Sequence, residues 1–321
     1  MNGERHQQWK VVILGTGAVG GLYGAKLAVA GDDVTFLARS DYHALRTSGL
    51  HVETPEGNLV LKRPQVTRNP QQLPQADLVL VCWKATANAA LEPALHACCG
   101  PHTCVLVLQN GWEIERDVAQ VIGPDRVLGG CCFLCANRVA PGRIHHLDYG
   151  GITFGEYASS TRGTITERVQ RIARHLHTAG IDAQPCADLH LARWKKLAWN
   201  IPFNGLSVVL KADTRQLISQ PETRALAEAL MREVQQCARS VSGVEVYDAH
   251  VAKMLADTEA MVPYASSMLL DYRHRRPMEV EPIFGNPLRA AIAAGYHPPR
   301  IDMLYQLLKF IDRRNQSGAA G

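Results

Sequence analysis

Short unbroken apolar runs alternate with helical stretches along the first part of the chain. Residues 11–14 are all apolar, which is typical of a strand buried on both faces of a parallel sheet. The next stretch predicts a helix over residues 18–30 that ends at Gly31, and residues 34–37 form a second, β-branched and aromatic strand. A strand, a helix and a strand of these lengths predict a β-α-β unit.

Further strands and helices follow at similar intervals. The predicted elements are a helix near 41–48, a hairpin around the turn at 54–57, strands at 78–82 and 103–109, and a helix over 85–97. From residue 126 to 155 strand-like segments succeed one another, broken at Pro141–Gly142 and Gly150–Gly151, and could extend the sheet. Strands that alternate with helices predict a doubly wound sheet with ligands at the carboxyl ends of its strands.

Beyond residue 164 the apolar residues recur at helical spacing. The amphipathic helices are expected at about 165–179, 189–210, 221–242, 247–257, 263–272, 283–294 and 300–313. The change of pattern near Cys186 predicts two domains, residues 1–186 and 187–321. The fold class is therefore α/β, with an N-terminal Rossmann-type doubly wound sheet and an all-helical C-terminal domain. The small residues at 317–321 predict a disordered tail.

The composition is that of a two-domain globular protein. A chain of 321 residues can bury two sizeable cores. The net charge of +4 and the isoelectric point near 8.6 are mildly basic, and because the Lys and Arg residues are scattered, we expect no nucleic-acid partner. The densest basic group, at 273–276, has the character of an exposed helix face, although an anionic substrate or cofactor would benefit from the same charge.

The cysteines and the chain start bear on compartment and metal content. The nine cysteines lie largely within apolar runs, as expected for reduced cytoplasmic thiols. Cys131, Cys132 and Cys135 with His145 and His146 lack the paired spacing of a metal site, so no metal is expected. No apolar signal core or membrane-length run is present. We therefore expect a cytoplasmic enzyme with a small-molecule substrate and no membrane partner; a homodimer stays open.

A glycine-rich turn follows the first strand. Gly15, Gly17 and Gly20 match the G-x-G-x-x-G pattern: the first glycine permits a tight turn, the second lets backbone approach a pyrophosphate, and the third lets the helix pack close to the strand. The amides at the helix start would face the phosphates. The alternative is a purely structural turn. The candidate cofactor-binding residues of this turn are Gly15, Thr16, Gly17, Ala18, Val19 and Gly20.

The end of the second strand distinguishes the two nicotinamide cofactors. An Asp or Glu there accepts hydrogen bonds from the ribose, whereas an Arg accommodates a 2′-phosphate. The strand runs into Arg39, which favours NADP (NADPH). Alternatively, Arg39 is a solvated surface charge and Asp41 is the ribose acid. We prefer Asp41 as the cap of the following helix.

One helical stretch combines apolar bulk with a polar stripe. Lys196, Asn200 and Asn204 recur every four residues and therefore share one face. Such a stripe either faces water or lines a cleft, and the bulky apolar residues around the rest of the helix favour the cleft. Pro202 cannot donate to the carbonyl of Ala198 and should kink or loosen the helix.

Several segments, in their order and spacing, resemble the ketopantoate reductase family, the NADPH-dependent 2-dehydropantoate 2-reductases. The segments are GTGAVG at 15–20, Arg39, Lys84, Gln109-Asn110-Gly111, Trp194–Leu197 with Asn200 and Asn204, Ser266–Leu269 with Asp271, and Met278–Glu281. The resemblance spans nearly the whole chain after the first nine residues. It implies reduction of ketopantoate to pantoate, a step of pantothenate biosynthesis, in a cleft between the two domains.

The resemblance also implies roles for single residues. Lys196 matches the general acid that protonates the carbonyl oxygen as hydride arrives, and a lysine with an ordinary pKa of about 10.4 is protonated at neutral pH. Glu279 matches an acid that contacts substrate or the cofactor ribose and favours the charged lysine. Asn110 matches a residue between nicotinamide ribose and substrate. The other matches are Asn200, Asn204 and Ser267 to substrate contacts, Arg39 and Lys84 to positions near the 2′-phosphate, and Cys135 to a backbone contact with the cofactor.

Each match has a plainer alternative. These are Lys195 in place of Lys196, an ordinary exposed Glu279, and a purely structural Ser267. The family's substrate-binding asparagine about ten residues beyond Asn204 has no clear equivalent, and Asp213 or Thr214 could replace it. Two rival functions therefore stay open: a reductase of another 2-oxo acid, and an NADP-binding sensor without turnover.

Overall fold

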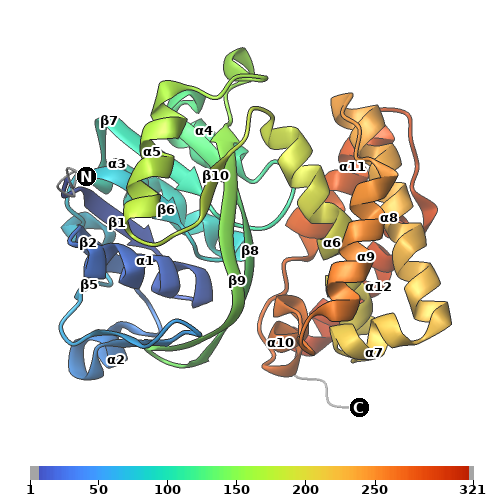
Figure 1. The fold of residues 1–321 in the computed structure, drawn as a ribbon, viewed down its shortest axis with the longest axis horizontal. Helices are drawn as coiled ribbons and strands as arrows, with labels where there is room; N and C mark the ends of the chain where they lie inside the picture. Colours follow the sequence, from blue (N-terminus) through green and yellow to red (C-terminus); the bar gives the residue numbers. More distant parts are fainter. Residues whose placement is uncertain (1–6, 318–321) are drawn as a thin grey trace. The chain divides into compact units, whose positions relative to one another are not determined.

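The computed structural model describes residues 7–317, which form two compact units (Figure 1). Unit 1 comprises the described residues up to Gln109 together with Ile114–Leu189. Unit 2 comprises Asn110–Glu113 and the described residues from His190 onward. The boundary near Cys186 stays a prediction, but the short segment Asn110–Glu113 groups with unit 2, which the sequence pattern did not suggest. The part of the predicted disordered tail beyond residue 317 lies outside the described residues.

Unit 1 is built on a ten-stranded sheet. Its strands are β1 (Lys10–Leu14), β2 (Asp33–Leu37), β3 (Leu50–Glu53), β4 (Leu59–Leu61), β5 (Gln65–Thr67), β6 (Ala76–Val81), β7 (Cys99–Val107), β8 (Val127–Ala140), β9 (Arg143–Glu156) and β10 (Ala183–Pro185). The order is β4-β3-β9-β8-β7-β6-β1-β2-β5, with β10 beside β9. From β5 to β8 all neighbours are parallel, and β1 lies where the strand order reverses, as in dinucleotide-binding sheets. The predicted Rossmann-type sheet is confirmed.

The antiparallel part of the sheet was only partly foreseen. The hairpin predicted around residues 54–57 is confirmed, since β3 pairs antiparallel with β4. β8 and β9 form a second hairpin that turns at Pro141–Gly142 and extends the sheet. The expected break at Gly150–Gly151 is wrong, because β9 continues through it with a shift of register opposite Phe133 and Leu134.

Helices cover both faces of this sheet (Figure 1). They are α1 (Ala18–Ala30), α2 (Tyr42–Ser48), α3 (Leu91–Cys98), α4 (Glu115–Ile122) and α5 (Glu167–Thr178), with 3₁₀ turns at Pro70–Gln72, Ala85–Ala90, Pro124–Arg126 and Ser159–Thr161. Val11 and Ile13 of β1 pack in one apolar cluster with α1 and α5, whereas Val12 and Leu14 pack in another with α3 and α4. The unbroken apolar run therefore reflects burial on both faces, as predicted. The sequence analysis missed α4, β5 and β10.

Unit 2 is all-helical, as predicted. Its helices are α6 (Leu189–Leu210), α7 (Thr214–Ser219), α8 (Pro221–Ser242), α9 (Asp248–Ala260), α10 (Ser267–Arg273), a π-helix at Glu281–Gly285, α11 (Asn286–Ala293) and α12 (Pro299–Gln316). α6 runs through Pro202 as one helix. The helix predicted over 283–294 begins instead with the π-helix, and α7 was not foreseen. Among residues 7–317, no helix combines the length and apolar character that a membrane span requires.

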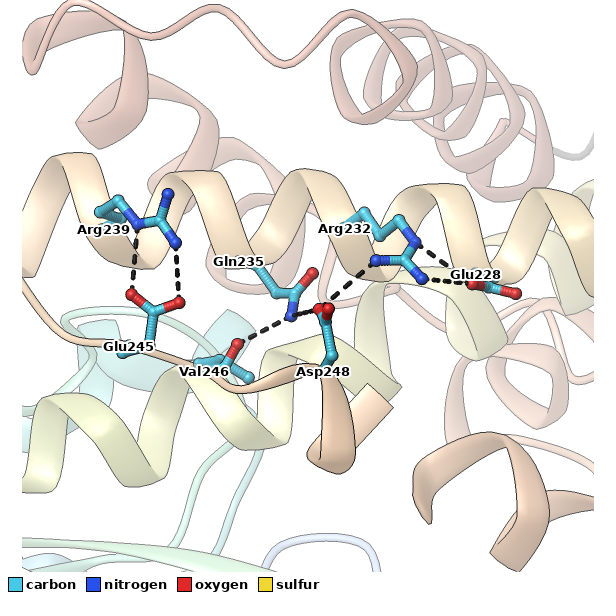
Figure 2. A network of polar contacts seen from close by, with 7 residues as sticks. All are labelled: Glu228, Arg232, Gln235, Arg239, Glu245, Val246 and Asp248. Carbon is cyan, nitrogen blue, oxygen red and sulfur yellow. Dashed lines mark hydrogen bonds and ion pairs between the residues drawn. The ribbon is translucent and has the colours of Figure 1, made fainter. Parts of the chain in front are cut away.

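Residues of α8 make two kinds of ionic contact. Figure 2 shows the exposed kind, in which Arg239 on α8 pairs with Glu245 and Arg232 pairs with Glu228 and Asp248. Such solvated pairs contribute little to stability. The buried kind is Glu233 of α8, which accepts hydrogen bonds from the amides of Arg300 and Ile301 at 3.0 and 2.9 Å. Its carboxylate therefore satisfies free N–H groups at the start of α12.

We predict that Glu233→Ala lowers the free energy of unfolding by about 2–3 kcal/mol, because buried amides of α12 lose a charged acceptor. Urea unfolding monitored by tryptophan fluorescence would measure the loss. Glu245→Ala is the matched control and should leave the unfolding midpoint unchanged, since its partner Arg239 is exposed. Equal effects of the two substitutions would contradict this account.

Candidate functional site

The glycine turn after β1 has the geometry that the pattern predicts. Gly15 has a φ of 102°, and a Cβ there would lie 2.7 Å from the amide nitrogen of Trp83. A Cβ at Gly20 would lie 2.0 Å from the carbonyl oxygen of Gly15, so only glycine lets α1 pack against the turn. A Cβ at Gly17 would meet nothing within 4 Å. The middle glycine therefore faces open space, where a ligand could approach the backbone.

Three strand ends meet at this turn. The amide of Gly15 donates to Leu37 of β2 at 3.1 Å, and the amide of Trp83 donates to Leu14 of β1 at 2.8 Å. Arg39, which is exposed, and Lys84, which is half-buried, follow β2 and β6 at the same edge. The structure thus brings the glycine turn and both predicted phosphate-binding cations to one side of the sheet, at the start of α1.

The thiol nearest the turn carries no charge that would oppose an anion. Cys82 follows β6, and its Cβ would lie 2.9 Å from a Cβ placed at Gly20. Burial raises the pKa of this thiol well above its usual range, with a smaller contribution from Cys132. Cys82 is therefore neutral at physiological pH, and the cations dominate the local charge.

The predicted role of Asp41 as a helix cap is wrong. Asp41 occupies the N-cap position of α2, but its side chain makes no capping hydrogen bond. Its buried carboxylate instead accepts from the guanidinium of Arg138 on β8, with Nε to Oδ2 at 2.8 Å. A charged partner has outcompeted the helix amides, because a charge-assisted bidentate pair is stronger than a cap.

Cys135 and the other clustered Cys and His residues lie on β8 and β9. Cys135 is buried and pairs with Asp148 across the hairpin, and its neighbours Leu134 and Ala136 pack in the apolar cluster that contains the start of α1. The proposed backbone contact of Cys135 with a cofactor stays a prediction. Within residues 7–317, no three His, Cys, Asp or Glu side chains gather closely enough to hold a metal ion.

The polar stripe of α6 is buried in unit 2. Asn200 and Asn204 are each only 2 % exposed, and Lys196 is half-buried. The Nζ of Lys196 lies 5.5 Å from the ring centroid of Trp199. The Nδ2 of Asn200 donates to Oδ1 of Asn110 at 3.4 Å. The interpretation that the stripe simply faces water is therefore wrong for the two asparagines.

Asn110 reaches α6 because the segment after β7 docks onto the π-helix. Gly111 has a φ of 125° and passes so close to Pro282 that a Cβ would lie 2.6 Å from its carbonyl oxygen. The next amide, of Trp112, donates to that oxygen at 2.9 Å, and Asn286 donates its Nδ2 hydrogen to the Trp112 carbonyl at 2.9 Å. Glycine is required here both by conformation and by space.

Glu279 lies just before this docking point. It is 3 % exposed, so the alternative of an ordinary exposed residue is wrong. The π-helix begins two residues later, and π-helices are frequent at functional sites because they redirect side chains. Unit 2 thus holds the Asn110–Asn200 pair together and buries Glu279 beside the helix that supports Asn110, an arrangement that sequence spacing alone could not show.

Comparisons with known proteins agree on one family. A family model described as "Ketopantoate reductase PanE/ApbA" matches residues 11–159, and its C-terminal counterpart matches residues 188–312. A Nostoc protein named 2-dehydropantoate 2-reductase is 47% identical over 96% of this chain and 97% of its own length. The chain belongs to the ketopantoate reductase family. A Halobacterium salinarum protein of the same name is 30% identical over 95% of this chain and 99% of its own. The crystal structure of 2-dehydropantoate 2-reductase from Geobacter metallireducens covers 94% of this chain and 99% of its own, with 37% identity and a TM-score of 0.90.

Serines lie around Asn204, at the C-terminal part of the α6 stripe. Asn204 Oδ1 is buried and accepts no hydrogen bond within residues 7–317. Ser207 donates to the Asn204 carbonyl at 3.0 Å and lies 2.6 Å from Ser266 Oγ. Ser266 caps α10, and Ser267 is half-buried beside it. The sequence analysis assigned no role to Ser207 or Ser266, although a serine just before the helix that contains Met268 and Leu269 is an N-cap signal.

Both residues suggested as a replacement for the family's missing asparagine have hydrogen-bond partners within unit 2. Asp213 forms a capping box with Gln216 at the start of α7, with side-chain hydrogen bonds of 2.8 and 2.9 Å. Thr214 is buried and accepts from the Tyr264 amide at 3.1 Å. Both side chains therefore serve the fold of unit 2.

We predict that alanine affects stability at one glycine of the turn and not at another. Gly20→Ala should lower the melting temperature, because its Cβ would overlap the carbonyl of Gly15, whereas Gly17→Ala should leave it unchanged, since its Cβ meets open space and its φ of −69° suits any residue. Thermal unfolding by circular dichroism without cofactor compares the two. Comparable destabilisation by both would show that the space at Gly17 is not open.

Proposed function

We propose that this protein reduces 2-dehydropantoate to pantoate with NADPH. The observation that carries the proposal is the buried face of α6, where Lys196 shares a stripe with Asn200, which is hydrogen-bonded to Asn110. A helical core does not bury such polar groups without a compensating role. The 47% identity to a protein named 2-dehydropantoate 2-reductase supports the substrate.

The residues of unit 1 fit a phosphorylated dinucleotide. The open space at Gly17, the amides at the start of α1, and the cations Arg39 and Lys84 suit a pyrophosphate and a 2′-phosphate. When bound, NADPH supplies the hydride. The residues proposed to hold it are Gly15, Thr16, Gly17, Ala18, Val19, Gly20, Arg39, Lys84, Asn110, Cys135 and Glu279.

The chain's own groups supply the proton and the orientation. The Lys196 ammonium donates a hydrogen bond to the ketone oxygen, polarises the carbonyl and transfers its proton as the carbonyl carbon receives the hydride, which leaves an alcohol and a neutral amine. The amine regains a proton from solvent. Buried Glu279 favours the charged form of the lysine.

Three polar residues orient the substrate in this proposal. Asn110 and Asn200 fix each other's amides through their hydrogen bond, which reduces the entropy lost when the substrate binds. The unused Oδ1 of Asn204 would accept from a substrate hydroxyl, which 2-dehydropantoate carries. Ser267 is proposed as a further contact. A 2-oxo acid without that hydroxyl would leave Asn204 unsatisfied, which favours 2-dehydropantoate over its simpler relatives.

We propose that the protein acts in the cytoplasm and as a homodimer. Analytical ultracentrifugation would test the assembly, and a single species with the mass of one 35.2 kDa chain would contradict it.

The loss of NADPH absorbance, measured with purified protein and 2-dehydropantoate, tests the function directly. We expect NADPH-dependent reduction that exceeds reduction with NADH, and slower turnover of 2-oxo acids that lack the hydroxyl. Binding of NADPH without reduction of any 2-oxo acid would favour the NADP-binding sensor. Faster reduction of another 2-oxo acid would show that 2-dehydropantoate is not the preferred substrate.

Lys196→Ala should lower turnover by about 10²- to 10⁴-fold, because the ketone loses its proton donor. Lys195→Ala is the matched control: the adjacent residue carries the same charge, is also half-buried and lies off the asparagine stripe, so turnover should stay near that of the unmodified protein. Unchanged turnover in Lys196→Ala, or an equal loss in both, would remove Lys196 from the chemistry.

A further inference from the structure

The segment after β2 contains a carboxylate whose charge would repel the 2′-phosphate of the proposed cofactor. Asp41 is the one acidic residue between Asp33 and Glu53, and it lies two positions beyond Arg39. An acid in this part of a dinucleotide fold accepts hydrogen bonds from the ribose hydroxyls and repels a 2′-phosphate. Arg39 and Asp41 therefore favour different cofactors, and the contacts of Asp41 decide which preference prevails.

Every acceptor position of Asp41 is already used. Arg138 donates from Nε to Oδ2 at 2.8 Å and from Nη2 to Oδ1, Ser40 donates its hydroxyl to Oδ1 at 2.9 Å, and the Gly142 amide donates to Oδ2 at 3.3 Å. Two carboxylate oxygens offer about four lone-pair sites, so these four donors fill them. The carboxyl side chain is 2 % exposed. It has no acceptor left for a ribose hydroxyl.

The same pair changes the charge at the end of β2. Arg138 comes from β8, far away in the sequence, and its side chain is three-quarters buried. The guanidinium neutralises Asp41 across a short, poorly screened distance. The exposed Arg39 pairs with no acid within residues 7–317, so its charge stays uncompensated there. Arg138 also donates to Ser40 Oγ at 3.3 Å, so it orders the residue between Arg39 and Asp41.

The pair with Arg138 takes the Asp41 side chain away from the cap that its position at the start of α2 would favour. Asp is among the best N-cap residues, and diverting its side chain from the amides of α2 forgoes about 1 kcal/mol. We propose that Arg138 is a positioning residue for cofactor selectivity: by occupying Asp41, it prevents ribose recognition and leaves Arg39 free to bind a 2′-phosphate. This inference rests on the proposed function, because it concerns the dinucleotide site of that reaction.

The test measures dissociation constants of NADP⁺ and NAD⁺ by isothermal titration calorimetry, with no substrate present. In Arg138→Gln the bare Asp41 charge should reduce the preference for NADP⁺ over NAD⁺ by on the order of tenfold. In the double variant Asp41→Asn with Arg138→Gln the preference should return, because no uncompensated charge remains. Arg143→Gln removes an exposed arginine from the same hairpin and should change nothing.

A merely structural role predicts different results. Arg138→Gln would then weaken both cofactors equally, and the double variant would not restore the preference; either result overturns the inference. If Arg138→Gln does not fold, the variants Asp41→Asn and Arg138→Lys test the inference instead. Both should retain the preference for NADP⁺ over NAD⁺, and loss of that preference in either variant contradicts the inference. Failure of the unmodified protein to bind either dinucleotide would instead refute the proposed function. Its preference for NAD⁺ would refute the inference and the proposed use of NADPH, but not the reductase activity.

Discussion

The arrangement of unit 1 depends on burying β1 on both of its faces. Successive side chains of a strand point to opposite sides, so the four apolar residues Val11–Leu14 enter two different clusters. Each such side chain contributes about 1.5–3 kcal/mol when fully buried. This burial fixes the central position of β1, and the carboxyl end of the strand then places the glycine turn beside the ends of β2 and β6. The position of this edge, our proposed anion-binding site, is thus a consequence of the core.

Unit 2 follows the opposite principle, because its distinctive feature is polarity where a helical core would normally be apolar. Asn200, Asn204 and Glu279 are buried, and burial of such groups is unfavourable unless each finds a partner or a ligand. The hydrogen bond from Asn200 to Asn110 meets part of that requirement. The Oδ1 of Asn204 accepts no hydrogen bond within residues 7–317, and in our proposal the substrate supplies its partner, which gives the reaction part of its specificity.

Asp41 illustrates how one side chain can have three competing uses. It could cap α2, bind a ribose or pair with a cation, and all three are consistent with its place in the sequence. A guanidinium delivered by β8 offers two charge-assisted hydrogen bonds, more than a neutral amide or hydroxyl can offer. The outcome links the hairpin of β8 and β9 to the segment after β2 that we propose recognises the nucleotide.

The sequence by itself determined those elements of the protein that follow from a local pattern of residues. The run of apolar residues, the glycine spacing and the four-residue polar repeat predicted β1, the turn with its three glycine roles, and the stripe of α6, since each reflects a geometric period of the backbone. α7 and the π-helix were missed because a single turn or an extra residue per turn leaves little periodic signal. Only the tertiary structure decided that Asn110 joins unit 2, that Glu279 is buried and that Asp41 pairs with Arg138. These facts depend on which of several competing partners comes within reach, and partners 97 residues apart are brought together by the sheet, not by the local sequence.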